Sequence, residues 1–182
     1  MRLLLGLLLA VGLATPNNVF AQEDRIDRIL QVFSESCGRF AMRTNELRSY
    51  LAKDHWRASP EEEKRILASG RGQIWRGSSD TDELYFLSYD DGSCAMATAN
   101  VPTERLREAF RLLVIATGQI GQFDVKLRSD NLENDGEGQT HTLSFLLGKP
   151  GIRQAMQFEL ITVEKGDKNL VQLSAAGVDS TK

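Results

Sequence analysis

The chain has few of the residues that usually carry catalysis or bind metals, with only two histidines and two cysteines in 182 residues. Neither His55 nor His141 belongs to an H-E-x-x-H motif or to another spacing typical of metal ligands. No serine stands in a G-x-S-x-G motif, and Gly70-x-Gly72 lacks the spacing of a phosphate-binding loop. We therefore expect no catalytic residue, no metal and no cofactor, and we expect both histidines to be structural.

The chain also lacks a strong excess of charge of either sign. The sequence has 22 basic and 25 acidic residues, a net charge of −3. Proteins that bind nucleic acid usually present a strongly basic face, so we expect no nucleic-acid partner. The longest apolar run, Leu3–Leu13, is shorter than the roughly 20 residues that a transmembrane helix needs. No apolar stretch of about 20 residues follows Leu3–Leu13 either. The mature chain is therefore predicted to be soluble and to lack a transmembrane segment.

The N-terminal residues have the layout of a cleaved secretory signal peptide. Arg2 supplies the positive charge, Leu3–Leu13 the apolar run, and Val19-Phe20-Ala21 the residues that precede a cleavage site. We predict cleavage after Ala21, which places the protein in the periplasm or outside the cell. Cleavage after Ala14 and an uncleaved anchor are the alternatives. The expected domains are a signal peptide (1–21), a single domain (22–178) and a polar tail (179–182).

Two cysteines in an exported chain predict one disulfide bond. Cys37 and Cys94 lie 57 positions apart and are the only cysteines. A free-thiol pair and an intermolecular bond are the alternatives. Because neither cysteine belongs to a C-x-x-C redox motif, a structural bond within the chain is favoured.

Apolar residues at helical spacing predict helices in the N-terminal third and in the middle of the chain. Ile26, Leu30, Phe33 and Cys37 form one stripe over 23–37, and a second helix is expected over 40–53. Ser59-Pro60-Glu61-Glu62 is a typical helix start, in which Ser59 caps the helix and Pro60 fits the first position. A longer helix is expected from Pro102 to about Gly121.

Alternating apolar and polar residues predict strands elsewhere. Asp90-Asp91-Gly92-Ser93 is a typical tight turn between two of them, which explains its paired carboxylates without a catalytic role. The predicted fold is α+β, with N-terminal helices and one central helix packed on an antiparallel sheet of about seven strands. The expected strands are 73–77, 84–89, 94–99, 123–128, 140–147, 156–160 and 170–176.

Two groups of side chains are candidates for binding. Trp75, Tyr85 and Tyr89 are the candidate binding surface, because exposed aromatic side chains are typical of recognition sites; packing in the core is the alternative. The acidic segment Asp130–Gly138 resembles part of a calcium loop, but Thr142 stands where the bidentate Glu is required. We expect this segment to be a solvated hairpin loop, with a weak calcium site as the alternative.

The order of elements from Phe33 to Cys94 is similar to that of a family of exported proteins. An exported helix with Cys37, a Gly-Arg-Gly-Gln-Ile-Trp strand and a strand that ends in Asp-Gly-Ser-Cys resemble a group of small proteobacterial secreted proteins and lipoproteins of unknown function. The likeness covers about residues 30–115, without the lipobox cysteine of the lipid-anchored members. It implies a periplasmic setting and a Cys37–Cys94 bond, and it implies no active site.

These observations favour a non-enzymatic exported protein that binds another protein or an envelope component. A hydrolase is one alternative, with a site assembled in space from His141 or His55 and a carboxylate. An immunity or inhibitor protein that neutralises an exported toxin is another. A pocket with a histidine beside a buried carboxylate would favour the hydrolase, whereas an exposed aromatic patch around Trp75 and Tyr85 would favour binding.

Overall fold

The computed structural model describes residues 17–67, 71–78, 83–134, 136 and 138–179. The helices are α1 (Asn17–Phe33), its π-helical continuation η1 (Ser34–Gly38), α2 (Thr44–Asp54), α3 (Pro60–Ile66) and α4 (Thr103–Gly121). The strands are β1 (Trp56–Arg57), β2 (Gly72–Ser78), β3 (Glu83–Tyr89), β4 (Cys94–Ala99), β5 (Asp124–Asn134), β6 (Gln139–Gly148), β7 (Gln154–Lys165) and β8 (Lys168–Asp179).

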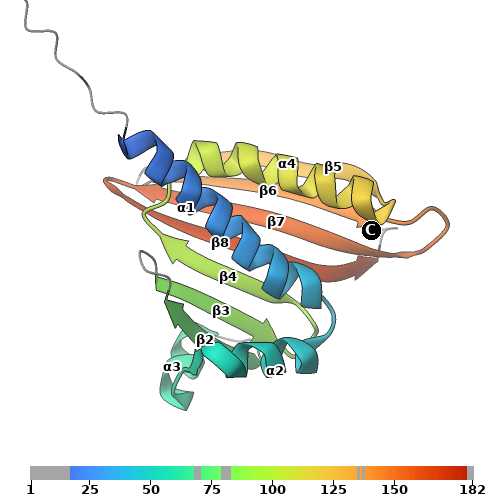
Figure 1. Ribbon diagram of the computed structural model, residues 1–182, viewed down its shortest axis with the longest axis horizontal. Helices are drawn as coiled ribbons and strands as arrows, with labels where there is room; N and C mark the ends of the chain where they lie inside the picture. The colour runs from blue at the N-terminus through green and yellow to red at the C-terminus, as the bar shows by residue number, and fades with distance from the viewer. Residues whose placement is uncertain (1–16, 68–70, 79–82, 135, 137, 180–182) are drawn as a thin grey trace, which may run out of the picture.

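The strands form one antiparallel sheet in the order β1-β2-β3-β4-β8-β7-β6-β5. After β4 the chain crosses the sheet as α4 and returns from the far edge as a four-stranded meander, so the last strand pairs with β4. Helices α1 and α4 lie over the same face (Figure 1). The expected α+β fold is confirmed, with the two-residue strand β1 in addition to the seven strands expected.

The apolar stripe of α1 packs on this sheet as its spacing predicts. Phe33 is fully buried where α1, α4 and β7 meet. Its ring centroid lies 5.8 Å from that of Phe158 and 6.3 Å from that of Phe110. Aromatic pairs at these separations stabilise a core beyond the area that they bury. The side chains of α1 and η1 that reach the core are Ile26, Ile29, Leu30, Phe33 and Cys37.

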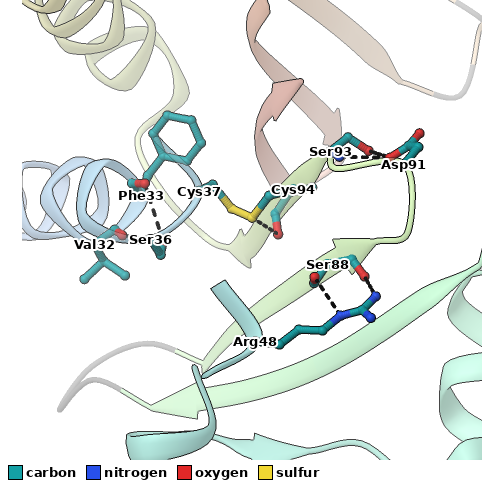
Figure 2. The surroundings of a disulfide bond; sticks show 10 residues. Val32, Phe33, Ser36, Cys37, Arg48, Ser88, Asp91, Ser93 and Cys94 are labelled. Atoms are coloured by element: carbon teal, nitrogen blue, oxygen red, sulfur yellow. Dashed lines mark hydrogen bonds between the residues drawn. A yellow bond between two sulfur atoms is a disulfide. The ribbon is translucent and has the colours of Figure 1, made fainter. Parts of the chain in front are cut away.

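The predicted disulfide bond between Cys37 and Cys94 is confirmed. Figure 2 shows it joining the turn of η1 to the first residue of β4. Both sulfur-bearing side chains are buried. Beside the bond, the Ser36 hydroxyl donates to the Val32 carbonyl at 2.6 Å. The bond therefore attaches the N-terminal helix to the centre of the sheet.

Helix α3 begins as the sequence predicts, with the Ser59 hydroxyl accepting a hydrogen bond from the Glu62 N–H at 3.3 Å. Its Glu63 carboxylate is buried and holds Arg57 of β1 at 3.0 Å and the Ile74 N–H of β2 at 3.1 Å. Burial alone raises the pKa of Glu63, but the hydrogen bonds from Arg57 and Ile74 outweigh it and the pKa is lowered. Glu63 therefore stays ionised and fixes α3 to the edge of the sheet.

The expectation of a loop over Asp130–Gly138 is wrong for its first part, because β5 continues to Asn134. The strand keeps its pairing with β6 as far as Asn134 and Gln139, and its register shifts between Leu127 and Ser129. Backbone pairing needs no apolar alternation, and this end of β5 is exposed on the sheet edge, where polar residues are tolerated. Positions 135 and 137 lie outside the described residues.

The predicted signal peptide and the predicted C-terminal tail are only partly covered by the described residues. Residues 1–16 of the predicted signal peptide and 180–182 of the predicted tail lie outside the described residues, while Asp179 belongs to β8. The peptide bond after Ala21 lies within α1. In the described part of the chain, no helix combines the length and the apolar character needed to cross a membrane.

Candidate functional site

The three aromatic residues of the candidate surface do not share one face. Trp75 is only 8% exposed and packs in the core beneath the helices. Tyr85 and Tyr89 point to the opposite face of the sheet, where both are partly buried. The Tyr85 hydroxyl donates to Glu83 at 2.6 Å, which raises the Tyr85 pKa, whereas burial raises the pKa of Tyr89. A single aromatic patch around Trp75 is therefore excluded.

A further aromatic side chain, which was not among the predicted candidates, lies on β1 at the edge of the sheet. Trp56 of β1 is 70% exposed and pairs with Arg76, which in turn pairs with Tyr85. The Arg76 guanidinium lies 5.4 Å above the Tyr85 ring and forms an ion pair with Glu62. The available signal was its position between the polar residues His55 and Arg57, with no apolar neighbour to pack against.

His141 is paired with a carboxylate, as the hydrolase alternative requires. Its Nε2 lies 2.6 Å from Oδ1 of Asp130, the neighbouring strand's residue on the same face. The other carboxylate oxygen of Asp130 accepts a hydrogen bond from Arg111 of α4 at 2.5 Å. The side chains of His141 and Asp130 are 20% and 35% exposed, so the pair lies at the rim of the sheet.

A second set of polar contacts joins α4 to β7 beside this pair. Arg107 donates to the Thr162 hydroxyl at 3.2 Å and lies 3.6 Å from the Glu164 carboxylate. Thr103 also bonds to Glu164. Arg107 and Arg111 are one helical turn apart, which places both guanidinium groups on the same side of α4. Together these contacts fasten the N-terminal half of α4 to the sheet.

The His141–Asp130 pair resembles the base and the orienting carboxylate of an acyl-transfer site, which also requires a nucleophile. An imidazole oriented by a carboxylate can act as a general base when a nucleophile lies within about 3 Å of its other nitrogen. Among the described residues, no hydroxyl or thiol makes a hydrogen bond with the His141 ring. His55 instead packs edge-on against Phe86 at 4.8 Å. The Asp130 carboxylate thus contacts both His141 of β6 and Arg111 of α4, and the three side chains join α4 to β5 and β6.

We predict that Asp130 makes stability depend on pH. The hydrogen bond with His141, followed by that with Arg111, lowers the Asp130 pKa. Its stabilisation is therefore complete above the unfolded-state pKa of about 4 and is lost as the pH falls through the lower folded-state value. Urea unfolding should show wild type more stable than Asp130→Asn at pH 7 and 5, with a smaller difference at pH 3.

The control for this pH dependence is Asp167→Asn, at an exposed turn between β7 and β8. This variant should follow wild type at all three pH values. A difference between wild type and Asp130→Asn that stays constant from pH 5 to pH 3 would contradict the role of the Asp130 carboxylate.

A groove runs between α1 and α4 on the side of these helices that faces away from the sheet. It encloses about 390 Å³, near the lower end of volumes usual for small-molecule sites. Three carboxylates and one arginine give it an acidic character. The groove is lined by Glu23, Ile26, Asp27, Arg105, Glu108, Ala109 and Leu112.

Exposed apolar side chains continue along α4 from the end of this groove. Leu112 is 63% exposed, Ile115 44% and Ile120 87%. Glu108, Leu112 and Ile115 follow the spacing i, i+4, i+7 and share one helical face. This face lies opposite the buried stripe of α4. Large apolar side chains gathered on one exposed helix face are typical of an interaction surface. We call Leu112 and Ile115 the α4 apolar stripe; Ile120, five residues after Ile115, lies on a different side of the helix.

The described residues contain no group of three or more histidine, cysteine, aspartate or glutamate side chains that could hold a metal ion. In the segment for which a weak calcium site was the alternative, β5 pairing extends through Asn131 and Glu133, so these residues are part of a strand and do not wrap around a central ion as in a calcium loop. No protein-family model, curated protein or solved structure matches the chain.

Proposed function

We propose that this chain is an exported, non-enzymatic protein that acts by binding another protein or an envelope component. The observation that carries the binding role is the α4 apolar stripe beside the acidic groove. Leu112 is 63% exposed, so most of its apolar surface is in contact with solvent. Burying this surface against a partner would contribute roughly 25 cal/mol per Å² of apolar surface.

The disulfide bond supports the export part of the proposal. Disulfides persist in oxidising compartments such as the periplasm and are rare in the cytosol. Cys37–Cys94 joins the first described helix to the sheet, and an oxidising compartment would let this bond form and persist. The apolar run Leu3–Leu13 behind Arg2 has the pattern of a signal peptide. The proposed location is the bacterial periplasm or the cell exterior, with cleavage after Ala21.

Intact-mass analysis tests the export proposal. The chain produced with its own N-terminus in a bacterium should be recovered from the periplasm starting at Gln22. Its mass should be two hydrogens below that of the dithiol form, because Cys37 and Cys94 are joined. Recovery of the uncleaved chain from the cytoplasm, or of two free thiols, would contradict the proposal.

Crosslinking in the periplasm tests the binding proposal. Wild-type protein should form a specific crosslinked product that the double variant Leu112→Asp/Ile115→Asp does not form. Leu170→Asp is the matched control, since Leu170 is 62% exposed and projects from β8 on the face away from α1 and α4. A product that survives the double variant, or is lost in Leu170→Asp, would contradict the role of α4.

The hydrolase is kept as a second proposal because His141 and Asp130 are in contact at 2.6 Å. An assay with activated ester and peptide substrates separates the two functions. Hydrolysis that is abolished in His141→Ala and retained in His55→Ala would favour the enzyme. An immunity or inhibitor protein is a special case of the binding proposal, and its partner would be captured through the same face of α4.

A further inference from the structure

We propose that the groove between α1 and α4, together with the α4 apolar stripe, binds a basic amphipathic helix of a partner protein. This inference depends on the proposed binding function and adds the chemistry of the partner. Three properties of the surface carry it: the charge of the groove, the spacing of the apolar side chains and the shape formed by two neighbouring helices.

The groove carries uncompensated negative charge. Arg105 lies 3.7 Å from Glu23 and offsets that carboxylate. Asp27 of α1 and Glu108 of α4 are both exposed, and within the described residues neither forms an ion pair with an arginine or lysine. A lysine or arginine of a partner placed between Asp27 and Glu108 would meet a carboxylate on each wall. Charge complementarity of this kind favours encounter and selects the partner.

The apolar side chains have the spacing of a surface that receives a helix. Glu108, Leu112 and Ile115 lie on one face of α4 and span about 10 Å along its axis at about 1.5 Å per residue. A partner helix that repeats apolar residues at i, i+3 or i+4, and i+7 could cover Leu112 and Ile115 while its basic residues reach the groove. Binding of an amphipathic helix between two helices is a common recognition mode.

The same charges disfavour the other classes of partner. Nucleic acids and anionic lipid surfaces attract basic residues, whereas Glu23, Asp27 and Glu108 outnumber Arg105 in the groove lining. An uncharged ligand could donate hydrogen bonds to Asp27 and Glu108 but would form no ion pair with either carboxylate. The occupant that uses both the charge and the apolar stripe is a cationic, amphipathic helix.

A designed peptide pair tests this proposal on the mature, disulfide-bonded protein. One 18-residue peptide has leucine on one helical face and lysine on the other, and the second replaces every lysine by glutamate. In fluorescence anisotropy, the lysine peptide should bind at least tenfold more tightly than the glutamate peptide. Amide NMR shifts should move at Glu108, Leu112 and Ile115, and the peptide should gain helical circular dichroism on binding.

Charge reversal makes the test specific. In Asp27→Lys/Glu108→Lys the affinity for the lysine peptide should fall at least tenfold, and the glutamate peptide should become the better ligand. The control Glu133→Lys/Asp167→Lys changes the net charge equally at exposed positions on β5 and a turn and should leave both affinities unchanged. Melting curves like that of wild type establish that all variants fold.

The outcomes separate this inference from the proposed function. Equal binding of both peptides, unchanged affinities in Asp27→Lys/Glu108→Lys, or NMR shifts confined to other faces would overturn the basic-helix proposal. If the crosslinked product still depends on Leu112 and Ile115, the proposed binding function then stands without it. Lysine-peptide binding that the uncharged variant Leu112→Ser does not weaken would likewise overturn the role of the stripe.

Discussion

The double variant Cys37→Ala/Cys94→Ala is expected to lose about 4 kcal/mol of unfolding free energy. The bond closes a loop of 57 residues, and the chain-entropy model assigns about this value to a loop of that length. For a chain of this size, such a loss corresponds to a melting temperature lower by roughly 8–16 °C. Both cysteine side chains are buried, so alanine leaves little unsatisfied polarity and the entropic effect dominates.

Urea and thermal unfolding followed by circular dichroism measure this loss. Wild-type protein unfolded in the presence of a reductant is the first control and should show a similar loss, because it lacks the bond and keeps both side chains. A variant with the same midpoint as oxidised wild type would mean that Cys37–Cys94 does not stabilise the fold. If reduced wild type and the variant lose the same unfolding free energy, the loss comes from the missing bond and not from the packing of the sulfur atoms.

Phe33→Ala should destabilise the protein by about 3–5 kcal/mol, the usual cost of removing a buried aromatic ring. The Phe33 side chain is fully buried. It contacts Phe110 of α4 and Phe158 of β7, and a chain of rings continues from Phe110 to Phe145 at 6.2 Å. Removing Phe33 leaves a cavity at the point where α1, α4 and the sheet meet.

Phe123→Ala is the matched control for this cavity. Phe123 is only partly buried beside Gly121, and its ring lies 5.3 Å from the Lys149 amino group. We expect a loss well below that of Phe33→Ala in urea titrations of both variants. Similar losses in the two variants would contradict the central position of Phe33. Phe33→Leu should recover part of the stability, since it refills most of the volume.

The parts of the fold that depend on neighbouring residues could be predicted from the sequence. The apolar residues between Ile26 and Cys37 recur at helical spacing, and their side chains are the ones that the structure buries. Ser59 and Pro60 start α3 because a capping hydroxyl and a fixed φ angle act within a single turn. The disulfide followed from there being two cysteines and a pattern typical of export.

The parts that depend on contacts between distant residues could not be predicted in this way. Tyr85 and Tyr89 are four residues apart in one strand and therefore share a face, but the face of Trp75 relative to them depends on its pairing with Phe86. The contact between His141 and Asp130 likewise depends on the register shift in β5. Trp56 and the groove of α1 and α4 required the position of the sheet edge and the packing of two helices that are far apart in sequence.

The pairing of β4 with β8 has a consequence for the order in which the chain would fold if it is exported as proposed. A chain that crosses a membrane from its N-terminus delivers Cys37 and Cys94 before α4 and the four strands that follow. The disulfide can therefore close while the centre of the sheet is still open. The edge of β4 that pairs with β8 has no neighbouring strand until the end of the chain arrives, and an unpaired edge of this kind is open to pairing with other chains in the interval.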